Sequence, residues 1–239
     1  MIDLSASKTS STPLYLQIAS SIRRQINEGQ IAMGEAIPSE RDLCELTGAS
    51  RVTVRKAIGQ LIEEGLLCRK QGSGTFVSER IEMPATYLGG FTEDARARGR
   101  EPGSVWLIRS YANPTREEAA VLKIHMSSVV ARLGRVRLSE GEPLAIEHAV
   151  VAESSVPPIE EIGDSLYAAL ATRGNRPQKG RQKVRASLAS PTEAGLLSIP
   201  ENSAVLRIER VTWLDDGTVI EFTRSAYRGD RYQFVTDIR

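Results

Sequence analysis

Cysteine, histidine and aromatic residues are scarce in this 239-residue chain. It contains two cysteines, two histidines and two tryptophans, and aromatic residues make up 5% of the sequence. Cys44 and Cys68 lie in short apolar patterns, without the further cysteines or the nearby histidine that complete a zinc site. We therefore expect two buried thiols, and the sequence indicates no metal site.

Long apolar runs are also missing. No stretch approaches the roughly 18 residues that a membrane-spanning helix needs, and the first residues, M-I-D-L-S-A-S-K-T-S-S-T, lack the basic start and apolar segment of a signal peptide. Hydrophobic residues still form 41% of the chain, which is enough for a substantial core. We expect a cytoplasmic protein of one or two domains without a membrane partner.

The scarcity of histidine leaves few groups for acid–base catalysis. His148 directly follows Glu147 in a β-prone run, so the two side chains would face opposite sides of a sheet. No Ser/His/Asp or Cys/His arrangement accompanies His125 or His148. The sequence therefore predicts no catalytic residue, no cofactor and no enzyme.

Positive charge is concentrated rather than abundant. The net charge is only +1, so bulk electrostatics does not indicate a nucleic-acid partner. Residues 51–80 nevertheless hold six basic side chains against three acidic ones. The basic segment opens with S-R-V-T-V-R-K at residues 50–56, which reads either as a solvated helix face or as a surface for an anionic partner.

Three amphipathic helices are predicted before residue 66, because apolar residues recur there at a spacing of three to four. The predicted N-caps and terminal glycines are, in order, Thr12 and Gly29, Ser39 and Gly48, and Ser50 and Gly65. Pro13 would occupy the first position of the first helix. The second helix carries a capping box from Ser39 to Asp42, with Leu43 and Leu46 as apolar positions. In the third, we expect Val54, Ala57, Ile58 and Leu61 to face the core.

The short segment T-G-A separates the second and third helices, as in a helix-turn-helix. L-L-C-R-K and T-F-V-S then flank Q-G-S-G, which predicts a β-hairpin. Gly72 and Gly74 would let its tip approach a phosphate closely. This order predicts a winged helix-turn-helix, with Arg51, Thr53, Arg55 and Lys56 facing outward from a recognition helix.

The same segment resembles the GntR-type bacterial transcription regulators. The resemblance rests on P-S-E-R-D-L at 38–43, S-R-V-T-V-R-K-A-I at 50–58, L-I-E-E-G-L-L at 61–67 and Q-G-S-G-T-F-V at 71–77. It implies a homodimer bound to double-stranded operator DNA. The predicted DNA-binding residues are Arg41, Ser50, Arg51, Thr53, Arg55, Lys56 and Gly72.

The rest of the chain alternates short helical and β-prone segments. We predict residues 1–78 as the DNA-binding domain, 79–90 as a linker and 91–239 as a second domain. Helices are expected at 92–98, where Thr92 would be the N-cap, after the capping boxes at Thr115 and Ser190, and within 164–174. Strands are expected near 103–112, 128–138, 143–151, 178–188, 203–214 and 218–227. This pattern predicts an α+β fold with a mainly antiparallel sheet.

Two predicted hairpins, at 132–148 and 207–222, resemble each other and suggest an internal duplication. Arg135 then corresponds to Arg210, and Glu147 to Glu221. Strand alternation places Leu133, Arg135 and Arg137 on one face, with about 7 Å between the Cα atoms of the two arginines. Two like charges at that distance need an anionic partner. Either the two glutamates neutralise them, or a phosphate or carboxylate ligand does.

A second anion-binding feature precedes the helix at residue 92. There G-G-F-T combines flexible glycines, a Thr92 hydroxyl and the free N–H groups of a helix N-terminus, which together suit an anion. An ordinary capped helix is the alternative. Together with Arg135 and Arg137, this turn predicts a phosphate pocket.

The second domain resembles the HutC subfamily of GntR regulators, and is most similar to its N-acetylglucosamine-utilisation repressors. The resemblance rests on F-T-E-D, R-V-R-L-x-x-G-E-P-L-A-I-E, S-L-Y-A-A-L and R-S-A-Y-R-G-D-R-Y-Q-F-V. It implies a chorismate-lyase-like fold, a repressor, and a small-molecule effector such as glucosamine-6-phosphate or N-acetylglucosamine-6-phosphate. The effector-binding residues it implies are Phe91, Thr92, Arg135, Arg137, Glu147, Ser165, Glu221 and Tyr227.

Three alternatives stay open from the sequence. The effector could be a different anionic metabolite, because Gly89 and Gly90 stand where amino-sugar-responsive relatives often carry a hydroxyl residue. The second domain could be a dimerisation module without a ligand, or, on a lyase-like scaffold, an enzyme.

Overall fold

The structure, a computed structural model, divides into two compact units, Met1–Ile81 and Glu82–Arg239. It describes residues 12–70, 72–78, 80–84 and 88–237. Residue 71 of the predicted hairpin and residues 79 and 85–87 of the predicted linker lie outside the described residues. None of the helices in the described ranges is long and apolar enough to span a bilayer.

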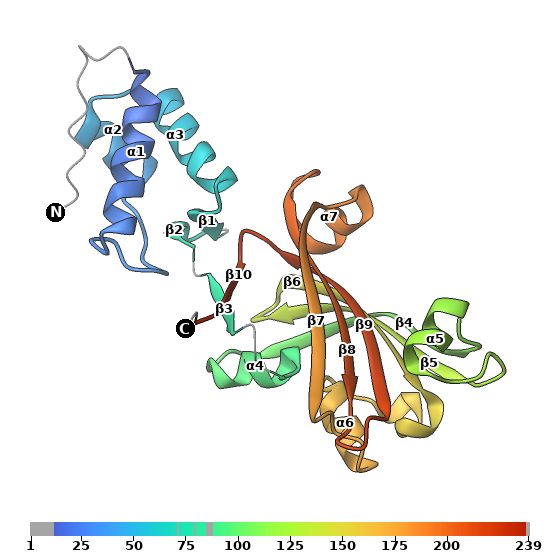
Figure 1. The fold of residues 1–239 in the computed structure, drawn as a ribbon. Helices are drawn as coiled ribbons and strands as arrows, with labels where there is room; N and C mark the ends of the chain where they lie inside the picture. Colours follow the sequence, from blue (N-terminus) through green and yellow to red (C-terminus); the bar gives the residue numbers. More distant parts are fainter. Residues whose placement is uncertain (1–11, 71, 79, 85–87, 238–239) are drawn as a thin grey trace. The chain divides into compact units, whose positions relative to one another are not determined.

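The first unit consists of three helices followed by a two-stranded antiparallel hairpin (Figure 1). Its elements are α1 (Leu14–Asn27), α2 (Glu40–Thr47), α3 (Arg51–Glu63), β1 (Leu67–Lys70) and β2 (Gly74–Val77). All four residues predicted to face the core from α3 are buried. They pack with Ile18, Ile22 and Leu43 in one apolar cluster. The predicted winged helix-turn-helix arrangement is therefore confirmed.

Local predictions in this unit fail at three places. Pro13, not Thr12, is the N-cap of α1, because Pro13 has extended dihedral angles (φ −51°, ψ 138°) and helical geometry begins one residue later. Leu46 is exposed on α2, whereas Leu43 is buried in the core. The two free cysteines are half-buried rather than buried. By contrast, the capping box of Ser39 and the N-cap Ser50 are present as predicted.

The second unit is built on a six-stranded antiparallel sheet in the order β4-β5-β6-β9-β8-β7 (Figure 1). Its strands are β4 (Pro102–Ala112), β5 (Val130–Ser139), β6 (Glu142–Ala152), β7 (Lys179–Leu188), β8 (Ala204–Trp213) and β9 (Val219–Arg228). The helical elements are α4 (Phe91–Ala97), α5 (Arg116–Leu122), η1 (Glu153–Ser155), η2 (Ile159–Glu161), α6 (Leu166–Thr172) and α7 (Pro191–Leu197). The predicted α+β class with a mainly antiparallel sheet is confirmed, as are the capping boxes at Thr115 and Ser190.

A second, two-stranded sheet was not predicted. It pairs β3 (Ile81–Pro84) with β10 (Tyr232–Val235), and a hydrogen bond of 2.9 Å from Gln233 Nε2 to Glu82 Oε1 supports the pairing. The predicted linker, residues 79–90, therefore contains a strand. Each strand has only four residues, too few to show a clear alternation in the sequence.

The two faces of the large sheet carry different helices. Leu133 packs with Leu166 and Leu170 of α6 on one face. The residues that alternate with these along β5 and β6 pack on the other face. There, Val136 of β5 contacts α7 and Val150 of β6 contacts α5. Arg135 and Arg137 share the parity of Leu133, so the side that also carries α6 receives both guanidinium groups, as predicted.

The strand register supports the suspected internal duplication. The pair Ala149↔Thr223 lies between the pairs Glu147↔Ser225 and Val151↔Glu221 at the β6/β9 junction. A two-fold rotation at that central pair exchanges the two glutamates, and the strand order is symmetric about the same junction. The duplication thus places Glu147 and Glu221 on one face of the sheet.

Candidate functional site

The first turn of α3 presents exposed cations. Arg51, Arg55 and Lys56 are exposed, as predicted for the recognition helix. Thr53 differs from the prediction because it is half-buried, and its hydroxyl lies 2.9 Å from Oγ of Ser50. Ser50 Oγ also accepts the backbone N–H of Thr53, which makes Ser50 a structural cap. Thr53 is therefore less accessible to DNA than the sequence predicts.

Neighbouring groups hold two of these cations to the sides of the helix. The guanidinium of Arg55 donates to Glu40 Oε2 at 2.7 Å, and this hydrogen bond raises the pKa of Arg55. Arg69 of β1 reaches the other oxygen of Glu40 at 3.3 Å. Lys56 Nζ lies 4.0 Å from the centroid of the Tyr15 ring. Glu40 therefore brings a recognition-helix arginine and a hairpin arginine to one point.

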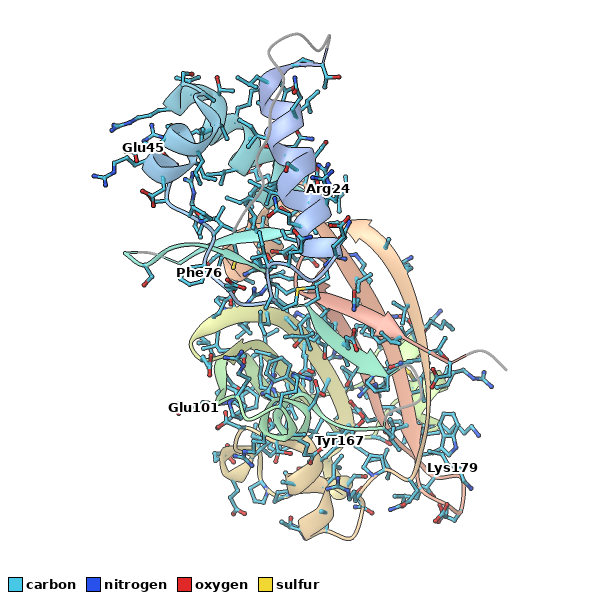
Figure 2. The ribbon with its side chains drawn as sticks, turned by 90° about the vertical axis from the view of Figure 1, so that its left-hand side faces the viewer. Arg24, Glu45, Phe76, Glu101, Tyr167 and Lys179 are labelled. Carbon is cyan, nitrogen blue, oxygen red and sulfur yellow. The ribbon has the colours of Figure 1, made fainter. Side chains whose placement is uncertain are left out.

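The remaining predicted DNA-binding positions lie nearby in the sequence. Arg41 is exposed on α2, with its Nε 3.6 Å from Glu45 Oε1. Figure 2 shows Glu45 projecting from the outer side of this helix. Gly72 has a φ of 74° at the hairpin tip, a left-handed conformation that favours glycine. A Cβ on Gly72 would meet no atom within 4 Å, so backbone geometry rather than crowding selects glycine there.

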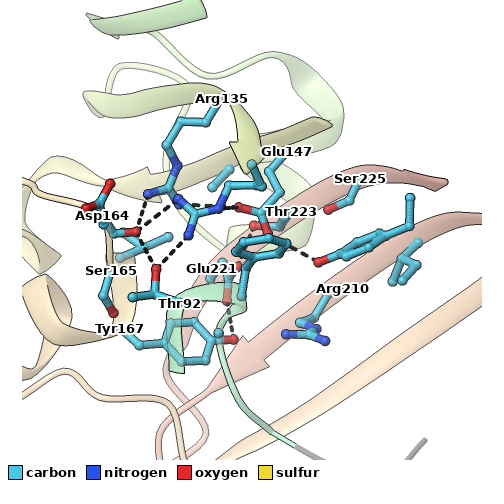
Figure 3. Close-up of a pocket in the computed structure, with 17 residues that line it drawn as sticks. Thr92, Arg135, Glu147, Asp164, Ser165, Tyr167, Arg210, Glu221, Thr223 and Ser225 are labelled. Carbon is cyan, nitrogen blue, oxygen red and sulfur yellow. Dashed lines mark hydrogen bonds and ion pairs between the residues drawn. The ribbon is translucent and has the colours of Figure 1, made fainter. Parts of the chain in front are cut away.

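One pocket in the second unit gathers all the predicted effector-binding residues (Figure 3). These are Phe91, Thr92, Arg135, Arg137, Glu147, Ser165, Glu221 and Tyr227. They come from α4, β5, β6, β9 and the segment before α6. The register that aligns the glutamates and the alternation of β5 together explain why residues over 130 positions apart meet here.

The two arginines converge on a single backbone oxygen. Arg135 Nη1 and Arg137 Nη1 donate to the carbonyl oxygen of Asp164 at 2.9 and 3.0 Å. The hydroxyl of Thr92 donates to the same oxygen at 2.8 Å. Glu147 Oε2 lies 3.4 Å from Arg135 Nη2 and 3.3 Å from Arg137 Nε. Three donors, two of them cationic, thus surround one neutral acceptor, as they would surround an oxygen of an anion.

The prediction that Thr92 is the N-cap of its helix is wrong. Gly90 is the N-cap of α4, and Glu93 Oε2 accepts the backbone N–H of Gly90 at 2.9 Å. Thr92 is 1% exposed and accepts a 2.6 Å hydrogen bond from Arg137 Nη2. Its hydroxyl belongs to the arginine cluster rather than to the helix end.

Both arginines of the pocket are buried beside acidic side chains. Arg135 and Arg137 are 3% and 1% exposed, so both charges are almost wholly removed from water. Burial lowers the pKa of Arg135 to about 10 despite the attraction of Glu147, so Arg135 remains protonated at neutral pH. Among the residues that the structure describes, Glu147 is the one carboxylate within ion-pair distance of both guanidiniums. Glu221 and Asp164 also attract Arg135 without an ion pair to it, so the buried guanidiniums lie among three carboxylates.

Glu221 attracts Arg135 electrostatically, but its hydrogen bonds come from hydroxyl groups. It accepts hydrogen bonds from the hydroxyls of Tyr167, Thr212 and Thr223. Burial, followed by the negative charge of Glu221, raises the pKa of Tyr167 well above its usual range, so this phenol stays a donor. The carboxylate of Glu221 is therefore fixed in place and oriented by three neutral donors.

The sequence did not predict several other residues of the pocket. Arg210 donates to the carbonyl of Gly89 at 2.9 Å and to Gln182 at 3.0 Å. The correspondence of Arg210 with Arg135 is wrong, because Arg135 is opposite Glu147 whereas Thr212 is opposite Glu221. The two-fold relates Arg210 to Leu133, whose side chain lies on the same face of the sheet. Tyr167 and the backbone of Asp164 carry no sequence signal.

The pocket is narrow in this conformation. Its volume is about 30 Å³, which accommodates one or two water molecules and no sugar. Arg137 helps to keep the pocket narrow, because its guanidinium is hydrogen-bonded to Thr92, Ser104 and the Asp164 carbonyl. A ligand of metabolite size can enter only if these donors exchange partners and the Asp164 segment moves.

Comparison with known proteins agrees with this architecture. A family model described as bacterial regulatory proteins, gntR family, matches residues 14–77, and a UTRA domain model matches residues 97–233. The chain is 37% identical over 236 residues to the HTH-type transcriptional repressor NagR of Bacillus subtilis (strain 168), covering 97% of each protein. It is 31% identical to the HTH-type transcriptional regulator GgaR of Escherichia coli (strain K12) over 226 residues, 95% of this chain and 91% of that protein.

A solved structure agrees as well. The crystal structure of PhnF from Mycobacterium smegmatis matches with a TM-score of 0.64 and 28% identity, covering 92% of this chain and 98% of that one. The relatives named above are transcription regulators and not enzymes. The chain therefore belongs to the gntR family of bacterial regulatory proteins, as a DNA-binding transcription regulator with a UTRA domain for effector binding.

Proposed function

We propose that this regulator is a homodimeric repressor released from its operator by a phosphorylated amino sugar, glucosamine-6-phosphate or N-acetylglucosamine-6-phosphate. The observation that carries the effector class is the convergence of Arg135, Arg137 and Thr92 on the Asp164 carbonyl oxygen. A phosphate oxygen offers the same donors a charged acceptor. The arginine–carbonyl bonds have a charged donor only, whereas a phosphate adds charge on the acceptor and can be bound by both forks, so the anion would displace the carbonyl.

The rest of the pocket suits the sugar. Glu221 is an oriented acceptor for a hydroxyl or amine, and Tyr227 donates to Glu147 Oε1 at 3.3 Å on the neighbouring strand. Ser165 caps α6 next to the Asp164 carbonyl, so movement of that segment would also reposition the Ser165 hydroxyl. A phosphate at one end and hydroxyl-reading carboxylates at the other are the features of a sugar phosphate site.

A different sugar-derived anion is the main alternative effector. A relative that is 31% identical is the mannosyl-D-glycerate transport/metabolism system repressor MngR of Escherichia coli (strain K12). A glycerate carboxylate could engage the same guanidinium pair, because the fork geometry of arginine fits carboxylate and phosphate alike. The buried guanidinium pair suits an anion of either kind, and we propose the phosphate.

On the DNA side, we assign operator contacts to Arg41, Ser50, Arg51, Thr53, Arg55, Lys56 and Gly72. The exposed cations of α3 suit phosphate and guanine contacts. Dimerisation would present two such helices to two half-sites. Release by the effector would start in the pocket, where Thr92 and Arg210 connect the ligand site to α4 and to Gly89, which precedes it.

A gel shift on the upstream region of the regulator's own gene tests the proposal. We expect a specific complex that glucosamine-6-phosphate or N-acetylglucosamine-6-phosphate dissociates, while glucosamine and N-acetylglucosamine do not. Sedimentation of the free protein should give twice the chain mass of 26.2 kDa. A complex that no phosphorylated sugar and no sugar carboxylate dissociates would contradict effector control and favour a ligand-free dimerisation domain. Conversion of the sugar phosphate to a product would favour an enzyme.

A further inference from the structure

Val52 is the second residue of α3 and stands apart from its basic neighbours. It is 78% exposed, more than any other large hydrophobic side chain in the described part of the chain. Single exposed apolar residues are common on protein surfaces, so exposure alone carries no function. Its position on the helix is more informative.

Helix geometry places Val52 at the centre of the outward face. At about 100° per residue, Val52 lies nearly opposite the mean direction of the four buried core residues of α3. Arg55 and Lys56 lie on either side of it at the next turn. Gly59, two turns along on the same face, adds no side chain that would keep a partner away. A partner that approaches α3 frontally therefore meets Val52 first.

The flanking cations leave the two methyl groups of Val52 uncovered. Arg55 is drawn to Glu40 on one side, with 2.7 Å between Nε and Oε2. Lys56 is drawn over Tyr15 on the other side. The front of the recognition helix thus has an apolar centre with a positive charge at each flank. The charges suit two phosphate backbones, and the apolar centre faces whatever lies between them.

The floor of the DNA major groove offers one apolar group, the C5 methyl of thymine. A valine gains nothing from a phosphate or from the hydrogen-bonding edge of a base, but it can remove its own surface and that methyl group from water. We propose that Val52 determines operator specificity by packing against a thymine C5 methyl in each half-site. The inference rests on the proposed DNA-binding function and adds the chemical group that this position reads.

Substitution of deoxyuridine for thymine tests the contact with the C5 methyl directly, because it removes only that methyl group. The probe is the duplex that the full-length protein enriches from a random library, with each thymine replaced in turn. We expect one replacement per half-site to weaken binding on the order of fourfold, the effect of one buried methyl group. Replacements elsewhere should be close to neutral.

The variant Val52→Ala completes a thermodynamic cycle. It should bind the thymine duplex on the order of sixteenfold more weakly than wild type, about fourfold for each half-site, and should lose its sensitivity to deoxyuridine at both positions. Val52→Thr, which keeps one γ-methyl group, should retain part of the sensitivity. Leu46→Ala is the matched control, because Leu46 is also an exposed apolar residue, 56% exposed, but lies on α2. It should leave the sensitivity unchanged.

Two outcomes would overturn the inference about Val52. If no single deoxyuridine weakens the wild type, no thymine methyl is read. If Val52→Ala weakens binding but keeps the deoxyuridine sensitivity, another residue reads the methyl and Val52 contacts sugar or phosphate. Failure to enrich any duplex would instead contradict the proposed operator binding. Comparing wild type with Arg51→Ala on non-specific DNA then shows whether α3 contacts DNA at all.

Discussion

The side chain of Arg137 donates a 2.6 Å hydrogen bond to the hydroxyl of Thr92, which lies 45 residues earlier in the chain. Since the Thr92 hydroxyl itself donates a hydrogen bond to the Asp164 carbonyl, it links three elements: β5, the start of α4 and the segment before α6. An anion that takes the place of that carbonyl must change the bonding of all three. Arg135 and Arg137 donate to the same carbonyl, so the Thr92 hydroxyl shares this link with both guanidiniums.

Arg137→Lys should weaken binding of the phosphorylated effector at least tenfold. Lysine keeps the charge but loses the planar fork that donates simultaneously to Thr92 and the Asp164 carbonyl. Calorimetric titration with glucosamine-6-phosphate measures the loss, and operator binding without effector should persist. Arg132→Lys is the matched control, because Arg132 forms a comparable two-bond pair with Glu118 outside the pocket. Equal effector affinity for wild type and Arg137→Lys would exclude the proposed phosphate site.

Glu40→Gln should strengthen binding to non-specific DNA at low salt. The Glu40 carboxylate competes with phosphates for Arg55 and Arg69, and its negative charge lies among the cations that face DNA. Removing that charge should increase affinity by about two- to tenfold, with a steeper salt dependence because more counterions are released on binding. Fluorescence anisotropy with a random duplex at several salt concentrations measures both.

The control for Glu40→Gln is Glu64→Gln. Glu64 forms a similar exposed pair, with 2.7 Å to Arg23, on α1 and the end of α3. Its removal changes the net charge equally but should leave the salt dependence of DNA binding close to that of wild type. Identical behaviour of the two variants would show that Glu40 has no local role at the DNA surface.

The sequence predicted most of the second unit because its strands are long and alternate clearly. β5 and β6 were found from local pattern alone, and their capped helices from residues such as Thr115 and Ser190. β3 and β10 were missed for a physical reason. Each gains strand geometry from a partner about 150 residues away, as the bond between Glu82 and Gln233 shows, and a local pattern does not carry that information.

At the pocket, too, local sequence patterns predicted some features and missed those that depend on distant contacts. Arg135 and Arg137 could be placed on one face because alternation is a local rule, and the structure brings all the predicted effector-binding residues together. The acceptor that they share is a backbone carbonyl, which every residue possesses, so its role leaves no trace in residue identity. Thr92 matched a capping pattern, but the N-cap is Gly90, two residues earlier, and the Thr92 hydroxyl accepts a hydrogen bond from Arg137 instead.

Gly229→Ala should destabilise the second unit by about 1–3 kcal/mol. A Cβ at residue 229 would lie 2.8 Å from the carbonyl oxygen of Ala204, a backbone atom that cannot swing aside. Gly195→Ala is the matched control, because Gly195 lies within α7 and a Cβ there meets nothing within 4 Å. That change should stabilise by roughly 0.5–1 kcal/mol, since alanine is the better helix former. Urea unfolding compares both, and a stable Gly229→Ala would contradict the observed approach of β8 to the turn after β9.

Glu193 should make stability depend on pH in the acid range. The Arg207 guanidinium donates to both of its carboxylate oxygens, at 2.7 and 2.9 Å, and the backbone N–H of Ser190 donates at 2.8 Å. The Arg207 hydrogen bonds, opposed by burial, lower the pKa of Glu193 to about 2. Because the folded pKa lies below the unfolded value of 4.5, the stabilisation is fully present above pH 4.5 and is lost as the pH falls toward 2.

Glu193→Gln should therefore cost about 1–2 kcal/mol at pH 7, a value reduced for partial solvent screening, and the cost should shrink as the pH is lowered from 4.5. Urea unfolding of both proteins at pH 7, 4.5 and 3.5 measures the difference. Glu201→Gln is the control, because Glu201 is an exposed residue just after α7, and its effect should be small at every pH. A cost for Glu193→Gln that stays constant down to pH 3.5 would show that the amide loses packing or capping geometry rather than the charge that Arg207 stabilises.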